Sequence, residues 1–128
     1  MIKFLLLAAG GALGTILRYS LSGAAYRVLG GVFPWGTLVV NLAGSLLIGL
    51  LWGFFEIENL SSNARNFIFI GVLGGFTTFS TFALESFNLF REGELKLAAA
   101  NVLVSNILGV ALVFVGILLS RHITNFLK

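Results

Sequence analysis

The stretch GVLGGFTTFSTF, residues 71–82, decides the fold of this chain, because it stands inside an apolar segment and yet combines glycines with hydroxyl side chains. Glycine costs a helix about 1 kcal/mol relative to alanine, and hydroxyl groups compete for the carbonyls of the helix. At membrane depth a broken backbone persists only where its polar groups line a cavity or find other partners, and freed carbonyls and N–H groups can hold an ion. We therefore expect a membrane helix that is broken here, near the bilayer midplane.

The whole chain has the composition of a membrane protein. Of its 128 residues, 58% are hydrophobic and 10% are charged, whereas about 25% of residues are charged in globular proteins. A helix needs roughly 20 apolar residues to cross the bilayer, and four stretches qualify, namely Phe4–Tyr26, Pro34–Phe55, Asn66–Phe90 and Leu97–Ser120. We expect an all-α, multi-pass protein of the cell inner (plasma) membrane, in which residues 1–128 form a single domain of four transmembrane helices.

The composition also argues against several classes of function. The chain has no Cys, no Asp and a single His, which leaves little from which to build a metal site or an acid–base pair. We therefore do not expect an enzyme. The eight Lys and Arg residues form no run, so nucleic acid is not an expected partner, whereas scattered positive charge in loops suits contact with membrane lipids.

Positive charge is nearly balanced between the two sides of the membrane. Four crossings place both termini and the 57–65 loop on one side and the other two loops on the opposite side. The first side carries Lys3, Arg65, Arg121 and Lys128, and the second carries Arg27, Arg91 and Lys96, joined by Arg18 if its side chain extends that way. Because Lys/Arg asymmetry sets orientation, we expect the chain to insert both ways. The alternative is that the apolar gradient or the insertion machinery fixes one orientation.

Small and polar residues recur every four positions on three spans, which aligns them on one helix face. The rows are Gly10, Gly14, Arg18 and Ser22; Thr37, Asn41, Ser45, Gly49 and Gly53; and Asn101, Ser105 and Gly109. Such faces bring helices together in lipid. For Gly49 and Gly53 we expect packing alone, whereas Thr37, Asn41 and Asn101 fit either a wet path or a helix contact. Polar faces on every span indicate an oligomer, and two oppositely inserted copies would form an antiparallel homodimer.

Two kinds of side chain inside the spans suggest transport. Phe79 and Phe82 share a helix face, and the positive edge of a phenyl ring can meet a small anion; the alternative is that both rings are only bulky apolar groups. Arg18 and Glu85 are the charges within the spans, and such charges are costly and often functional. Arg18 either attracts anions at a vestibule or extends to the interface, and Glu85 is either an interfacial cap or a proton carrier.

Three blocks of the sequence resemble the signature motifs of one family. GGALGTILR (10–18), GTLVVNLAG (36–44) and GVLGGFTTFSTF (71–82) are similar, in order and spacing, to those of the Fluc fluoride channels, also called the CrcB family. The resemblance covers essentially the whole chain. It implies a fluoride-selective ion channel that exports fluoride by passive conduction through two pathways in an antiparallel, dual-topology homodimer, with a structural sodium ion at the dimer interface.

The resemblance also implies roles for individual residues, to which the polar row of the second span adds Thr37. The expected fluoride pathway comprises Arg18, Thr37, Asn41, Phe79, Ser80, Thr81, Phe82 and Ser105. The main-chain carbonyls of Gly74 and Thr77 are expected to hold the sodium ion. Asn101 occupies a position at which many relatives carry a tyrosine, so its role stays open.

A proton-coupled cation exporter of the small multidrug-resistance type is the main alternative, because it also has four spans and often dual topology. That class depends on an acid in its first helix, whereas here the first span holds Arg18 and the membrane acid is Glu85 in the third. A structural or assembly subunit without transport is a third possibility, but it leaves the polar rows unexplained.

Overall fold

The computed structural model describes residues 1–57 and 60–126, and nearly all of them are helical. Four segments are long and apolar enough to cross a membrane: α1 (Ile2–Leu29), α2 (Trp35–Ile57), a segmented third span (Ser62–Arg91) and α6 (Leu95–Phe126). The chain is therefore a multi-pass membrane protein, as the sequence predicts. Lys128, which the charge balance includes, lies outside the described residues.

Each helix extends beyond the span that hydropathy predicts, except at the start of α2, which begins one residue after the predicted Pro34. At 1.5 Å per residue, the 28-residue α1 and the 32-residue α6 are about 42 and 48 Å long, more than the ~30 Å hydrocarbon layer. The second helix begins at Trp35 rather than at Pro34, because the Pro34 carbonyl accepts the helical hydrogen bond of the Leu38 N–H at 3.1 Å from just outside the first turn.

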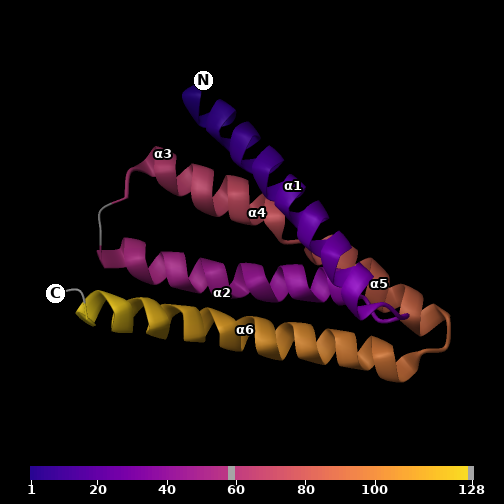
Figure 1. Cartoon of the computed structure of the whole chain (residues 1–128). Coiled ribbons are helices and arrows are strands. Elements are labelled where there is room, and N and C mark those ends of the chain that lie inside the picture. The colour runs from indigo at the N-terminus through magenta and orange to yellow at the C-terminus, as the bar shows by residue number, and fades with distance from the viewer. Residues whose placement is uncertain (58–59, 127–128) are drawn as a thin grey trace.

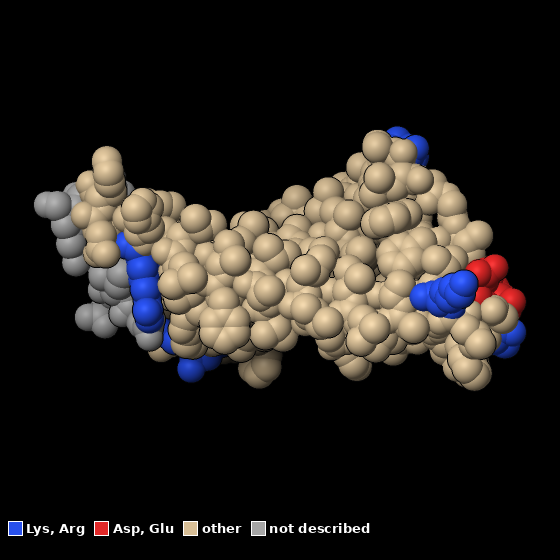
Figure 2. Space-filling view, turned by 90° about the horizontal axis from the view of Figure 1, so that it is seen from below, with Lys and Arg blue, Asp and Glu red and all other residues tan. Residues whose placement is uncertain are grey.

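The four spans form two pairs (Figure 1). Helices α2 and α6 lie side by side and run in the same direction, and α1 crosses the third span. The start of α1, the end of α2, the start of the third span and the end of α6 lie toward one end of the molecule, and the connections from α1 to α2 and from the third span to α6 lie at the opposite end. Figure 2 shows Lys and Arg gathered at both ends of one face, with a broad uncharged band between them. This distribution agrees with four crossings and with charge on both sides.

Close approach at glycine holds each pair together. A Cβ on Gly49 would overlap the Val113 carbonyl oxygen of α6, and one on Gly53 would overlap the Ser120 hydroxyl. A Cβ on Gly10 would come within 2.7 Å of the Phe67 carbonyl oxygen in the third span. The expected packing role of the small-residue rows is confirmed at these positions. The sequence analysis missed Gly116, where a Cβ would lie 2.5 Å from the Leu46 carbonyl oxygen.

The third span is broken near its centre, as predicted. It consists of α3 (Ser62–Arg65), the π-helical stretch η1 (Asn66–Leu73), the short α4 (Gly74–Phe76) and α5 (Phe79–Arg91). Between α4 and α5, Thr77 and Thr78 are extended, with φ/ψ of −84°/160° and −150°/114°. The first part of this span packs against α1, and α5 packs against α6. The break therefore lets the third span contact both its partner α1 and the α2–α6 pair.

Candidate functional site

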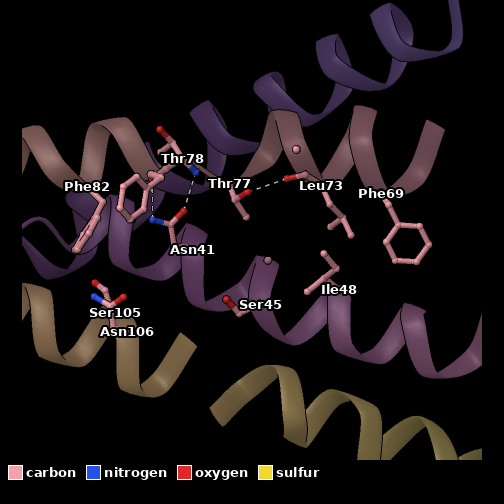
Figure 3. A pocket seen from close by; sticks show the side chains of 13 residues that line it. Asn41, Ser45, Ile48, Phe69, Leu73, Thr77, Thr78, Phe82, Ser105 and Asn106 are labelled. Atoms are coloured by element: carbon pink, nitrogen blue, oxygen red, sulfur yellow. Dashed lines mark hydrogen bonds between the residues drawn. The ribbon is translucent and has the colours of Figure 1, made fainter. Parts of the chain in front are cut away.

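The break in the third span is held by a single side chain of α2. The Asn41 amide donates through Nδ2 to the Thr78 carbonyl at 3.0 Å, and its Oδ1 accepts from the Thr78 N–H at 2.8 Å (Figure 3). Asn41 therefore satisfies both backbone groups of a residue that has left the helix. Such satisfaction is required at membrane depth, where an unpaired backbone group costs several kcal/mol. This contact with the main chain is the structural role of the asparagine.

Side chains of the two threonines complete the local structure of the break. Thr77 Oγ1 donates to the Leu73 carbonyl at 3.0 Å at the end of α4, where the Thr77 backbone turns extended. Thr78 is the N-cap of α5, because its Oγ1 accepts from the Thr81 N–H at 3.3 Å. Thr78 Oγ1 also donates to Thr81 Oγ1 at 2.9 Å. The hydroxyls that weaken a continuous helix thus stabilise the two ends that the break creates.

The break leaves main-chain oxygens available. Because the Thr78 N–H donates to Asn41, it does not continue the helical ladder to the Gly74 carbonyl. The Thr77 carbonyl accepts a long 3.5 Å hydrogen bond from Arg18 Nη1. Carbonyl oxygens are ligands that hard cations prefer. Gly74 and Thr77 both line one cavity, and the Thr77 carbonyl already has the positively charged Arg18 guanidinium as a partner.

A groove lies between the break, α2 and α6; we call it the Asn41 groove. It has a volume of about 340 Å³, and its polar lining comes from Asn41, Ser45, Thr77, Thr78, Ser105 and Asn106. Figure 3 shows Ser105 and Asn106 of α6 facing the break from the opposite side. Phe79 and Phe82 line the groove as well. None of the described residues that line it is charged, and the lining offers hydroxyl and amide groups next to aromatic rings.

The two phenylalanines differ in burial, although they stand three residues apart on α5. Their ring centroids are 5.5 Å apart with an interplanar angle of 47°. Phe82 is 8% exposed, whereas Phe79 is 76% exposed although it also borders the groove. The two rings therefore share a helix face, as the sequence predicts. Phe82 lies inside the groove and Phe79 lies at its edge.

A second cavity, the Arg18 hollow, lies on the other side of Thr78. It has a volume of about 420 Å³ and is lined by Thr15, Arg18, Ser22, Tyr26, Thr37 and Thr81, among others. Beside it, Glu85 Oε1 accepts from Thr37 Oγ1 at 2.8 Å and from the Tyr26 hydroxyl at 3.0 Å. Glu85 thus ties α5 to α1 and α2, while its Oε2 is buried and has no hydrogen-bond partner among the described residues.

The structure divides the predicted pathway residues between these two cavities. Asn41, Phe79, Phe82 and Ser105 line the Asn41 groove, together with Gly74 and Thr77, and Arg18, Thr37 and Thr81 line the Arg18 hollow. Thr78 borders both cavities and so connects the two groups. Ser80 is exposed on α5 and lines neither of them.

Thr37 and Asn101, whose use the sequence leaves open, are both buried and hydrogen-bonded. Thr37 is 5% exposed and donates to Glu85. Asn101 is 1% exposed and donates through Nδ2 to Ser86 Oγ at 2.9 Å, so it joins α6 to α5 within one chain. Both residues therefore make helix contacts, and Thr37 lines the Arg18 hollow as well.

Sequence reasoning missed Tyr26 and Ser86. Ser86 follows Phe82 by four residues and donates to its carbonyl at 2.8 Å, a spacing at which serine bonds to its own helix. The four-residue spacing could therefore have predicted this hydrogen bond of Ser86 from the sequence. The hydrogen bond from Tyr26 to Glu85 could not be predicted in this way, since it depends on how α1 packs against the third span.

Comparison with known proteins gives a consistent result. The model of the family described as CrcB-like protein, Camphor Resistance (CrcB), matches residues 5–117. A protein of Parabacteroides distasonis named fluoride-specific ion channel FluC is 50% identical over 128 residues, 100% of both chains. A protein of that name from Agrobacterium fabrum is 46% identical over 124 residues, 96% of this chain and 99% of its own. One from Salinibacter ruber is 50% identical over 116 residues, 91% and 87% of the two chains.

Proposed function

This chain belongs to the CrcB family, and we propose that it is a fluoride-selective channel that lets fluoride leave the cell passively. The relatives that match it along nearly their whole length carry the name fluoride-specific ion channel FluC. The observation that carries the proposal is the Asn41 groove, in which uncharged donors and phenyl rings meet at a broken membrane helix.

Fluoride is small and strongly hydrated, so a pathway must replace its water with fixed donors. Transfer of an unpaired anion to an apolar medium costs on the order of tens of kcal/mol. Hydroxyls, amides and the positive edges of phenyl rings offer partial positive charge without a full charge. Ser105, Asn106 and the ring of Phe82 supply these groups in the Asn41 groove. Binding by neutral groups stays weak enough for the anion to leave, which conduction requires.

The Arg18 hollow suits the entrance of the pathway. Arg18 provides a positive charge beside the hydroxyls of Thr37 and Thr81. Such a charge raises the local concentration of anions without contacting the narrow part of the path. The guanidinium is only half-buried, so it remains accessible to an arriving ion.

Two oppositely inserted copies would complete the site. Phe79 is 76% exposed, and the polar Asn41 groove reaches the surface beside it. Polar groups facing lipid are costly, so a second copy that covers this face would be favourable. The near balance of Lys and Arg between the two sides suits dual topology. A cation such as sodium, held by the Gly74 and Thr77 carbonyls of both copies, would offset the negative ends of these main-chain dipoles.

The test is release of anions from liposomes that contain the purified protein. Wild-type protein should release fluoride far faster than chloride, as measured with ion-selective electrodes. A second arm carries Glu92→Lys and Glu94→Lys, which add positive charge to one exposed loop, and a third carries Ser62→Lys and Asn63→Lys at the opposite end. Each biased protein alone should be inactive, and co-expression of the two should restore release.

The arms separate the parts of the proposal. Equal release of fluoride and chloride contradicts fluoride selectivity. Drug–proton exchange without anion release would favour a small multidrug-resistance-type exporter. Full activity of either biased protein alone would reject the antiparallel pair while leaving the fluoride pathway intact.

A further inference from the structure

Asn101 is a polar side chain buried in an unusual place. It stands in the second turn of α6 and is 1% exposed. A buried amide in a membrane protein must find partners for its donor and its acceptor. Asn101 finds both within this chain, and both partners lead to the Asn41 groove.

The hydrogen bonds around Asn101 form a chain with one direction. Ser86 Oγ donates its only hydrogen to the Phe82 carbonyl at 2.8 Å, so it can only accept from Asn101 Nδ2, at 2.9 Å. On the other side, Ser105 Oγ donates to Asn101 Oδ1 at 3.4 Å. The amide thus links a hydroxyl of α6 to the backbone at Phe82 of α5.

The two ends of this chain, Ser105 and Phe82, both line the Asn41 groove, whereas Asn101 itself does not. The bonds to Ser86 and to the Phe82 carbonyl are 2.9 and 2.8 Å long, while the 3.4 Å contact from Ser105 is longer than the roughly 2.5–3.0 Å that is usual for a hydroxyl hydrogen bond and is therefore weak. The Ser105 hydrogen is therefore held weakly by a fixed acceptor. An anion in the groove competes for that hydrogen more easily than for one bound at normal length.

We propose that Asn101 is a positioning residue for anion binding: it holds the Ser105 hydroxyl ready for release to the groove and, through Ser86, fixes the backbone that carries Phe82. This inference rests on the proposed function. Without the amide, the Ser105 hydroxyl would turn to a carbonyl of its own helix, the usual partner of a serine in a membrane helix. It would then be less available to an anion.

The experiment measures fluoride release from liposomes over a range of fluoride concentrations. Asn101→Leu removes the amide at similar volume, and Ser86→Ala cuts the same chain by losing one hydroxyl. We expect Asn101→Leu to raise the fluoride concentration for half-maximal release about three- to tenfold, the range of one neutral hydrogen bond. Ser86→Ala should raise it less, and adding Ser86→Ala to Asn101→Leu should change it no further.

Ser120→Ala is the matched control. Ser120 is also a buried polar residue of α6, 0% exposed, and among the described residues its hydroxyl donates to the Ile117 carbonyl of its own helix at 2.7 Å. It should leave the half-maximal concentration unchanged.

The outcomes separate positioning from plain stability. A merely structural Asn101 would lower the amount of active protein, and hence maximal release, with no change in the half-maximal concentration; that result overturns the inference while the channel function stands. If Asn101→Leu does not yield folded protein, an unchanged half-maximal concentration in Ser86→Ala overturns it instead. Wild-type protein that releases no fluoride would overturn the proposed function, and this inference with it.

Discussion

The α2–α6 pair and the third span solve the same problem, burial of backbone in lipid, in different ways. In α2 and α6 the helices are continuous, and glycines such as Gly49 and Gly116 let the two backbones approach closely. In the third span Gly71 and Gly75 also approach the backbone of α1, but the glycines there precede a break, and Asn41 replaces the lost helical bonds of Thr78. Glycine therefore has two uses in this molecule, close packing and interruption, and only the second needs a polar partner from another helix.

This difference predicts which kind of substitution lowers the stability of each region most. Along the α2–α6 contact, stability is spread over many apolar contacts and depends on shape. At the break, stability depends on a few hydrogen bonds, chiefly the two between Asn41 and Thr78, together with those of the Thr77 and Thr78 hydroxyls. Substitutions that change shape should damage the first region most, and substitutions that remove hydrogen bonds should damage the second.

The largest expected effect is Gly49→Ala. Its Cβ would overlap the Val113 carbonyl oxygen, a backbone atom that cannot move without separating α2 from α6. Overpacking typically costs about 1–3 kcal/mol and sometimes more, and here we expect about 3 kcal/mol of lost unfolding free energy. Unfolding in mixed micelles titrated with sodium dodecyl sulfate measures it.

Gly109→Ala is the control for that substitution, because its Cβ would meet only Ser45 Oγ, at an ordinary 3.5 Å. Alanine favours a helix by about 1 kcal/mol over glycine, so Gly109→Ala should be neutral or slightly stabilising. Equal losses for both substitutions would show that close approach does not hold this pair.

The second effect in size is Asn41→Leu, which removes both hydrogen bonds to Thr78. An unsatisfied buried donor or acceptor costs about 1–3 kcal/mol, and part of this is recovered if water reaches the Asn41 groove. We expect a loss of about 2–3 kcal/mol in the same micelle titration. Asn106→Leu is the control, since Asn106 Nδ2 bonds only to the Val102 carbonyl of its own helix at 2.7 Å; a loss as large as that of Asn41→Leu would mean that the break does not depend on Asn41.

Much of the fold could be predicted from the sequence, because its signals are local. Hydropathy gives the four spans, the row containing Gly49 and Gly53 gives the packing face of α2, and Gly74 to Thr78 mark the break. The surroundings of the candidate-site residues were harder to predict, because they depend on tertiary packing. Phe79 and Phe82 share a helix face in any α-helix, yet only the packing of α5 decides that one is exposed and the other buried.

The same limit applies to polar residues with two possible uses. Spacing alone shows that Thr37, Asn41 and Asn101 are aligned with small residues, and it does not show which of them meets main chain, side chain or open space. In the structure, Asn41 bonds to a backbone, and Thr37 and Asn101 bond to side chains of α5. Each partner is distant in the sequence, so no local pattern specifies it.

The smallest expected effects concern Glu85, where the two pairs of spans meet. Thr37 Oγ1 is buried and 2.8 Å from Glu85 Oε1, whereas Tyr26 is 38% exposed and its hydroxyl is 3.0 Å from the same oxygen. Hydrogen bonds between membrane helices average about 0.6 kcal/mol and reach about 1.7. Thr37→Val should therefore cost about 1–2 kcal/mol, and Tyr26→Phe about 0.5 kcal/mol, because water can replace the exposed tyrosine hydroxyl. The micelle titration of both variants measures the difference, and a larger loss for Tyr26→Phe would mean that α1, rather than α2, fixes Glu85 and the half of the third span beyond the break.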